Sequence, residues 1–187
     1  MTEQQIRHYI ISVTAADRVG IIHDLTRTIS ALGGDLADVR QQVLRGYFSM
    51  ILCVSFPADL REDAIREALI NIDPDHPFEI SIRPAPELAV SDKVPKNAYV
   101  LTARGSDRIG FVALVSGFCA ENSINILDLS TTGRDDTYTM ILLVDLSNAP
   151  PVESLRARLE RFSETHGLSL LLQHLDIFKA TNEIRMI

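Results

Sequence analysis

The sequence predicts an α+β fold made of two tandem βαββαβ modules, each with a four-stranded antiparallel sheet and two helices on one of its faces. The first observation behind this prediction is an internal repeat, because a shift of 90 positions without a gap places Tyr9 on Tyr99 and Gly20 on Gly110. The second is that strand and helix periodicities follow one another in the same order in both halves. The third is a composition with 46% hydrophobic and 23% charged residues, which is typical of a chain that packs a core.

The first module begins with a strand, a helix and a second strand. The first strand is expected over residues 6–13, and residues 20–32 carry apolar side chains at helical spacing. Gly33 and Gly34 end this helix, as glycine commonly does at a helix carboxyl end. A second strand is expected over residues 36–44, where the chain again becomes extended.

A third strand, a second helix and a final strand complete the module. Arg45–Gly46 turns the chain into a strand over residues 47–56, whose alternate residues are apolar, and a helix over 60–72 and a strand over 78–82 follow. The second module repeats this order and ends near Phe178. Right-handed crossovers then give the ferredoxin-like arrangement, in which the first and third strands are central.

One face of each predicted sheet has no helix to cover it. The third strands nevertheless carry apolar residues on that face, Ile51 and Cys53 in the first module and Ile141 and Leu143 in the second. We therefore expect the other module or another subunit to cover it, and the protein to form a homo-oligomer.

A proline-containing stretch separates the two modules. Pro84, Pro86 and Pro95 interrupt both strand and helix patterns between them. The predicted boundaries are a first domain over residues 1–88, a linker over 89–96 and a second domain over 97–187.

Composition and charge exclude several classes of function. The net charge of −7, with Lys and Arg spread along the chain, lacks the basic footprint of a nucleic-acid-binding protein, so we expect no direct contact with DNA or RNA. No apolar run approaches the ~18 residues that a membrane helix needs, so a cytoplasmic protein without membrane contact is expected. Cys53 and Cys119 lie in apolar stretches far apart, which predicts buried, reduced thiols rather than a redox or metal site.

The turn from the first strand to the first helix reads Asp-Arg-x-Gly in both modules. In a structural interpretation, Asp17 and Asp107 are helix N-caps, while Gly20 and Gly110 allow close packing. In a functional interpretation, the free N–H groups and the positive end of the helix hold a ligand carboxylate, and the aspartate meets an ammonium group. An amino acid carries both charges, and the two interpretations can hold together.

The residues around this turn resemble those of an ACT domain. Asp-Arg-Val-Gly-Ile-Ile at residues 17–22 precedes Gly-Asp-Leu-Ala-Asp at 34–38, and the second module has Ser-Ile-Asn-Ile at 123–126. The tandem layout, over nearly the whole chain, resembles the glycine cleavage system transcriptional repressor family. This resemblance implies a ligand site between two ACT modules, formed by the turn of one module and the start of the second strand of its neighbour. The matching positions are Asp17, Gly20 and Asp35 in the first module and Asp107, Gly110 and Asn125 in the second.

The two candidate sites differ in charge. Asp35 stands where the family commonly has asparagine, which places a second negative charge in the first site and disfavours a free carboxylate there. Asp107 with Asn125 is therefore the preferred site.

These patterns predict a regulatory protein that is not an enzyme and has no cofactor. The five histidines show no His-x-x-x-His or His-x-Glu spacing, and neither a Gly-x-Ser-x-Gly elbow nor a Gly-x-x-x-x-Gly-Lys loop occurs. We expect the protein to sense a small amino acid, with glycine or serine favoured by the resemblance, and to modulate a protein partner such as a transcription regulator of glycine metabolism. The alternative is a ligand-independent module for oligomerisation or protein docking.

Overall fold

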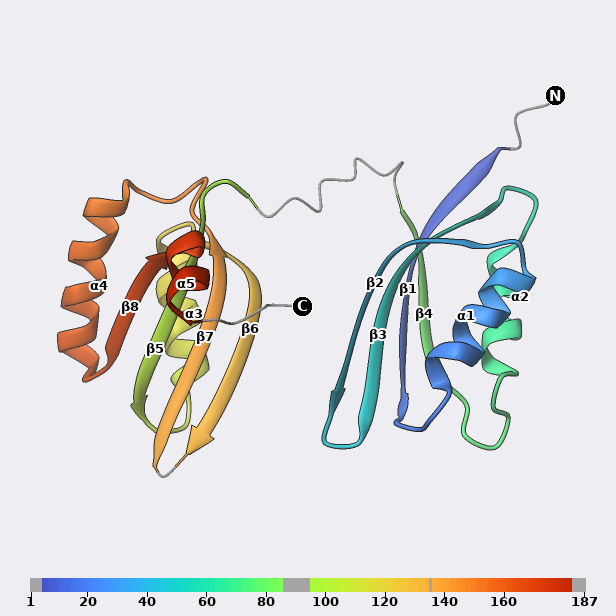
Figure 1. Ribbon diagram of the computed structural model, residues 1–187, viewed down its shortest axis with the longest axis horizontal. Helices are drawn as coiled ribbons and strands as arrows, with labels where there is room; N and C mark the ends of the chain where they lie inside the picture. Colours follow the sequence, from blue (N-terminus) through green and yellow to red (C-terminus); the bar gives the residue numbers. More distant parts are fainter. Residues whose placement is uncertain (1–4, 86–94, 135, 183–187) are drawn as a thin grey trace. The chain divides into compact units, whose positions relative to one another are not determined.

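A computed structural model describes residues 5–85, 95–134 and 136–182 of the chain (Figure 1). The chain divides into two compact units, Met1–Val90 and Ser91–Ile187. The predicted linker over residues 89–96 lies almost wholly outside the described residues. Each unit contains its own sheet and its own hydrophobic core, so each is described by itself.

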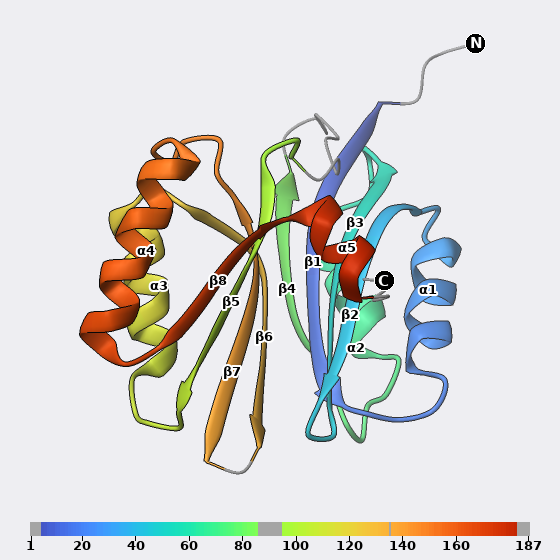
Figure 2. The same ribbon diagram turned by 60° about the vertical axis from the view of Figure 1, so that its left-hand side comes forward.

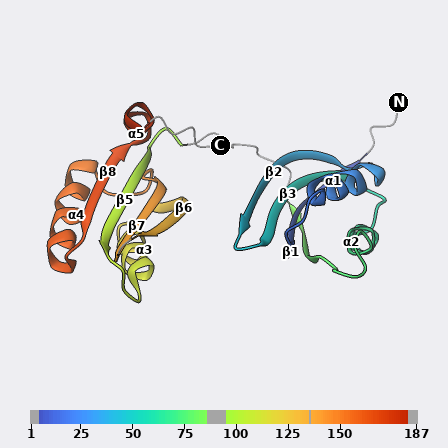
Figure 3. The same ribbon diagram turned by 60° about the horizontal axis from the view of Figure 1, so that its bottom comes forward.

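The first unit has the predicted βαββαβ order. Its elements are β1 (Ile6–Ala16), α1 (Ile21–Ala31), β2 (Asp35–Leu44), β3 (Tyr47–Pro57), α2 (Glu62–Ile70) and β4 (Glu79–Ala85). The strands form one antiparallel sheet in the order β2-β3-β1-β4, which confirms that the first and third strands are central. Figure 3 shows α1 and α2 on the same side of this sheet.

The core of the first unit lies between the sheet and the two helices. Alternate residues of β1 and β3 point towards the helices, and Ile11, Leu52 and Phe56 are fully buried there. Leu25 and Ile29 of α1 meet them from the helix layer. The period of two in the strands and the helical spacing in α1 therefore produce the sandwich that the sequence predicts.

β4 differs from the prediction in its length. The prolines were expected to end the sheet before Pro84, but β4 continues through Pro84 to Ala85. Because β4 is an edge strand, proline is tolerated there even though it cannot donate a backbone hydrogen bond.

The second unit repeats the order and adds one helix. Its elements are β5 (Ala98–Ser106), α3 (Phe111–Glu121), β6 (Asn125–Arg134), β7 (Thr137–Asp145), α4 (Val152–His166), β8 (Ser169–His174) and α5 (Leu175–Asn182). The sheet order β6-β7-β5-β8 matches that of the first unit.

The added helix α5 covers part of the sheet face that α3 and α4 leave open (Figure 2). Leu175 and Phe178 of α5 are buried against Ala98 and Val100, with Ile141 and Leu143 packed beside them. We expected another module or another subunit to cover this face. In the second unit the cover is instead α5, a segment of the same unit. In the first unit Ile51 remains 51% exposed on the corresponding face.

Both outer strands β2 and β6 contain an irregularity at the same place. The register shifts between Leu36 and Asp38 in β2 and between Ile126 and Asp128 in β6. The two aspartates each accept a hydrogen bond from the next backbone N–H, at 2.8 Å for Asp38 and 2.9 Å for Asp128. The bulge is thus a property of both modules.

Candidate functional site

The turn before the first helix has the same backbone in both units. Gly20 precedes α1 with φ 88° and Gly110 precedes α3 with φ 88°, both in the left-handed region. These glycines are the N-cap residues, and neither helix has a side-chain cap hydrogen bond. The expectation that Asp17 and Asp107 are N-caps is therefore wrong, because the chain makes an additional turn between each aspartate and its helix.

The role of the two glycines also differs from the expected one. A Cβ atom at Gly110 would meet nothing within 4 Å, and one at Gly20 would meet only Arg18 Nη1 at 4.0 Å. Close packing therefore does not require glycine at these positions. The positive φ angle does, because it is strained for residues that carry a side chain.

The aspartates fix the turn through their backbone and leave their side chains free. Asp17 N donates to Gly46 O at 2.8 Å and Asp107 N donates to Asp136 O at 3.0 Å, which ties each turn to the hairpin of its own unit. Both side chains are exposed, and within the described part of the chain neither carboxylate has a hydrogen-bond or ion-pair partner.

The arrangement offers both positive and negative groups to a ligand. The first N–H group of each helix already has an acceptor in the turn, since Ile21 N donates to Arg18 O at 3.5 Å and Phe111 N donates to Arg108 O at 3.3 Å. Helix geometry leaves the next N–H groups of α1 and α3 without intrahelical acceptors, and no side chain caps them. An uncapped helix N-terminus favours an anion, and the nearby free carboxylate favours a cation. A zwitterion such as an amino acid is chemically suited to this pair.

The arginine of the turn distinguishes the two units. Arg18 is paired twice, through Nη1 with Asp24 Oδ2 at 2.8 Å and through Nε with Asp73 Oδ2 at 3.2 Å. The hydrogen bond to Asp24 raises the pKa of Arg18, and the guanidinium also lies 6.0 Å from the centre of the Phe78 ring. Arg18 is thus neutralised within its own unit.

Arg108 has no such neutralisation. The positions that correspond to Asp24 and Asp73 are Leu114 and Ser163, and Arg108 Nη2 instead donates to the carbonyl oxygen of His166 at 3.1 Å. Among the described residues Arg108 forms no ion pair. We assigned no role to the two arginines from the sequence, although the loss of both acids in the second repeat was visible there.

The remaining predicted positions, Asp35 and Asn125, lie at the starts of β2 and β6. Both side chains are exposed. In each unit the first helix separates this position from the turn, and its 11 residues span about 16 Å. One unit therefore does not bring the turn and the strand start together. The predicted site, which joins the two from neighbouring modules, stays a prediction.

Asp35 lines an open groove of about 710 Å³ along the outer side of α1. The residues that line it are His23, Thr26, Arg27, Ser30, Ala31, Gly34, Asp35 and Leu36. Gly34 allows the chain to pass close to the core here, since a Cβ atom at this position would lie 2.5 Å from Phe56 Cε1.

Other chemical features of the described residues are few. Cys53 and Cys119 are both buried, as predicted, and burial raises the pKa of Cys119 to about 11. In the ranges that the structure describes, no group of three or more His, Cys, Asp or Glu side chains could hold a metal ion. No helix in these ranges is long and apolar enough to cross a membrane.

Comparison with known proteins agrees with the repeat. A family model described as ACT domain matches the chain twice, at residues 7–81 and 97–173. A UPF0237 protein of Methanocaldococcus jannaschii is 44% identical over 86 residues, which are 46% of this chain and 96% of that protein. A UPF0237 protein of Neisseria meningitidis is 41% identical over 91 residues, covering 47% of this chain and 99% of that protein. Each of these relatives is therefore about one module long.

Two solved structures match most of the chain. A protein of Galdieria sulphuraria has a TM-score of 0.72 and 28% identity, covering 91% of this chain and 99% of that one. A putative glycine cleavage system transcriptional repressor has a TM-score of 0.70 and 15% identity, covering 90% of this chain and 96% of that one. At this identity the second likeness shows the fold alone.

Proposed function

Because this chain belongs to the ACT domain family and contains that regulatory domain twice, we propose that it senses a small amino acid between ACT modules and thereby modulates a partner protein. Glycine and serine are the favoured ligands, and a transcription regulator of glycine metabolism is the favoured partner. The proposal assigns the chain no catalytic step. The likeness in fold to a putative glycine cleavage system transcriptional repressor supports the link to glycine metabolism.

The observation that carries the proposal is the repeated turn. In both units a free, exposed aspartate carboxylate stands beside a helix N-terminus that no side chain caps. The carboxylate of an amino acid would accept hydrogen bonds from the helix N–H groups, and its ammonium group would donate to Asp17 or Asp107. The start of the second strand of a neighbouring module, at Asp35 or Asn125, would close the site.

The second module is the better candidate of the two. Arg108 adds a positive charge that no described acid neutralises, whereas Arg18 is neutralised by Asp24 and Asp73. Asn125 is neutral where Asp35 is negative. Both differences favour the binding of a ligand carboxylate at the N-terminus of α3, beside Asp107. The asymmetry of charge therefore supports the preference for the second site.

A site that needs two modules provides a mechanism for regulation. Ligand stabilises the arrangement of modules that completes the site and shifts the population towards it. The protein has a net charge of −7, so an effect on transcription would pass through a DNA-binding partner rather than through direct contact with DNA.

A panel of the twenty amino acids in a thermal-shift assay tests the proposal. A ligand that binds only the native state stabilises it by about 2.7 kcal/mol at 100 times its dissociation constant. We expect glycine or serine to raise the melting temperature, and Asp107→Ala and Asn125→Ala each to abolish that rise.

The ligand-free melting temperature provides the control for this experiment. Asp107 does not cap α3 and its side chain has no partner among the described residues, so Asp107→Ala should change the free energy of unfolding by less than about 0.5 kcal/mol. Asp17→Ala is the matched variant and should leave most of the ligand response intact. A flat response to all twenty amino acids at millimolar concentration would contradict the proposal.

The alternative is a ligand-independent module for oligomerisation or docking. It is favoured by Val19 and Ile109, which lie at the tips of the two turns and are fully exposed, at 101% and 107%. The association state of Val19→Ser and Ile109→Ser variants, measured by sedimentation, distinguishes this alternative from amino acid sensing. The alternative predicts a change of association state with no dependence on amino acids.

A further inference from the structure

A groove of about 350 Å³ lies between α3 and α4 of the second unit. Two arginines of α4, a histidine at its end and two aromatic rings contribute to its walls, together with the acid Glu121. The residues that line it are Phe118, Glu121, Asn122, Arg158, Arg161, Phe162, Thr165 and His166. None of them is a predicted position of the amino acid site, although the carbonyl oxygen of His166 accepts a hydrogen bond from Arg108 Nη2 at 3.1 Å.

A buried amide positions one of the two arginines. Asn122 is only 5% exposed, and its Nδ2 donates to the carbonyl oxygen of Phe118 at 2.8 Å. Its Oδ1 accepts a hydrogen bond from Arg158 Nη1 at 2.9 Å. Because an amide is neutral, it fixes the guanidinium without cancelling its charge, as a carboxylate would.

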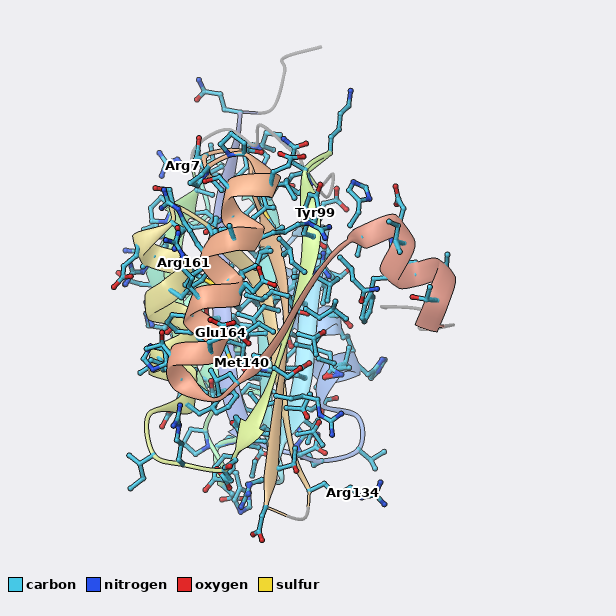
Figure 4. The ribbon with its side chains drawn as sticks, turned by 90° about the vertical axis from the view of Figure 1, so that its left-hand side faces the viewer. Arg7, Tyr99, Arg134, Met140, Arg161 and Glu164 are labelled. Carbon is cyan, nitrogen blue, oxygen red and sulfur yellow. The ribbon has the colours of Figure 1, made fainter. Side chains whose placement is uncertain are left out.

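The second arginine lies one turn further along the same helix. Arg161 Nε donates to the carbonyl oxygen of Ala157 at 3.3 Å, so its two terminal amino groups take no part in that bond. Figure 4 shows Arg161 above Glu164 on α4. In the described ranges neither Arg158 nor Arg161 forms an ion pair, with Glu121 or with any other acid.

Stacked rings provide the apolar part of the groove. The Phe162 ring lies 4.8 Å from the Phe118 ring and 4.4 Å from the His166 ring, between their centres. The contact between Phe118 and Phe162 joins α3 to α4, and the three rings line the groove together with the two guanidinium groups.

The first unit lacks this arrangement although it has the same fold. The residues that correspond to Asn122, Arg158 and Arg161 are Leu32, Ala68 and Asn71. The arginine in its second helix, Arg66, is instead paired with Glu62 at 3.1 Å. The groove is therefore not a requirement of the fold but a feature of the second module alone.

We propose that this groove binds the phosphoryl group of a small phosphorylated metabolite. Two guanidinium groups match the two negative charges of a phosphoryl group, and their planar N–H donors bind its oxygens in pairs. The volume of about 350 Å³ lies at the lower end of the range for small-molecule sites. In a chain whose net charge is −7, two adjacent arginines without acidic partners form a local anion site.

An NMR titration of the full-length protein with inorganic phosphate tests this proposal. The wild type should show saturable chemical-shift changes at the backbone amides of the groove, and Arg158→Ala and Arg161→Ala should each weaken binding by roughly tenfold or more. Arg156→Ala is the matched control, because Arg156 is exposed on the same helix and outside the groove. It should leave the affinity within about twofold, since it removes the same charge but no contact.

A second variant tests the role of the buried amide. Asn122→Leu introduces the residue that the first module has at this position, and it removes the hydrogen bond that fixes Arg158. We expect weaker phosphate binding with both guanidinium groups still present. The melting temperature of the Asn122→Leu variant, measured in parallel, checks that the variant is folded.

Several outcomes would overturn the proposal. One is the absence of saturable shifts up to about 10 mM phosphate, and another is an equal loss of affinity in the Arg156→Ala control. Acetate that binds as well as phosphate would exclude a preference for the phosphoryl group. The proposal does not rest on amino acid sensing, because Asp107→Ala should leave phosphate binding unchanged.

Discussion

Gly110 occupies a backbone conformation that other residues adopt only with strain. Its φ of 88° predicts that Gly110→Ala lowers the free energy of unfolding by about 1–2 kcal/mol, although a methyl group would meet no atom within 4 Å. Gly117 is the matched control, because it lies inside α3 with ordinary helical φ and open space around it. Gly117→Ala should raise the free energy of unfolding by about 0.5–1 kcal/mol. Urea unfolding of both variants checks this, and equal effects in both would contradict it.

Cys119 makes the stability of the second unit depend on alkaline pH. Burial raises the pKa of its thiol from 9.0 to about 11, so the folded protein holds this proton more tightly than the unfolded chain does. The resulting stability is complete below the unfolded pKa and is lost as the pH rises through the folded pKa, with an upper bound of about 3 kcal/mol. Urea unfolding at a series of pH values from about 8 to 10.5 should show a steeper decline for the wild type than for Cys119→Ala. Parallel curves for the two proteins would contradict this assignment.

The residues of the turn could be identified from the sequence, but not their roles. The repeat singled out Asp17 and Asp107, and short polar side chains before a helix normally indicate capping. The structure instead begins each helix after a left-handed glycine, which depends on a backbone angle that residue preferences do not determine. Asn122 was missed for another reason. Asn122 is buried and accepts a hydrogen bond from Arg158, which lies 36 positions away in the sequence. No local sequence pattern indicates such a contact.

Two buried side chains of α5, Leu175 and Phe178, pack against the sheet. Phe178 is 6% exposed against β5, and Ile177 on the same helix is 55% exposed. Phe178→Ala should destabilise the second unit by about 3 kcal/mol because it removes a buried ring, while Ile177→Ala should cost less than about 1 kcal/mol. Chemical denaturation measures both. Similar losses for the two variants would contradict the packing described for α5.

At the scale of elements, the sequence predicted every helix and strand that both modules contain. The strands and helices of both βαββαβ units occur in the predicted order, and their ends differ by a few residues, as for β1, which continues to Ala16 instead of Val13. Helix α5 was not predicted, because its counterpart one repeat earlier is the proline-containing stretch after β4 and offers no second example. The sequence pattern predicted the end of the second module near Phe178 and no helix there.

The whole molecule contains two separate main cores. Leu52 in β3 and Leu142 in β7 occupy corresponding positions and are both 0% exposed. We expect Leu52→Ala and Leu142→Ala each to cost about 2–5 kcal/mol. Hydrogen exchange should show the loss of protection mainly in the unit that carries the substitution. Loss of protection spread evenly over both units would mean that the two cores unfold as one.

The two modules share a backbone and differ in the placement of charge. Arg18 and Arg66 of the first unit are paired with acids, whereas Arg108, Arg158 and Arg161 of the second have none among the described residues. The two copies of a duplicated fold can differ in this way because a change of surface charge alters ligand preference with little effect on stability. The second module therefore carries both of the binding sites that we propose.

The bulge in β2 and β6 bears on how the protein behaves at high concentration. Both strands lie at the outside of their sheets, where unpaired backbone groups would otherwise offer a straight template to the next molecule. An extra residue near the start of each strand increases the local twist and interrupts the regular spacing of those groups. The bulge therefore disfavours a continuous strand-upon-strand stack of molecules through the β2 and β6 edges.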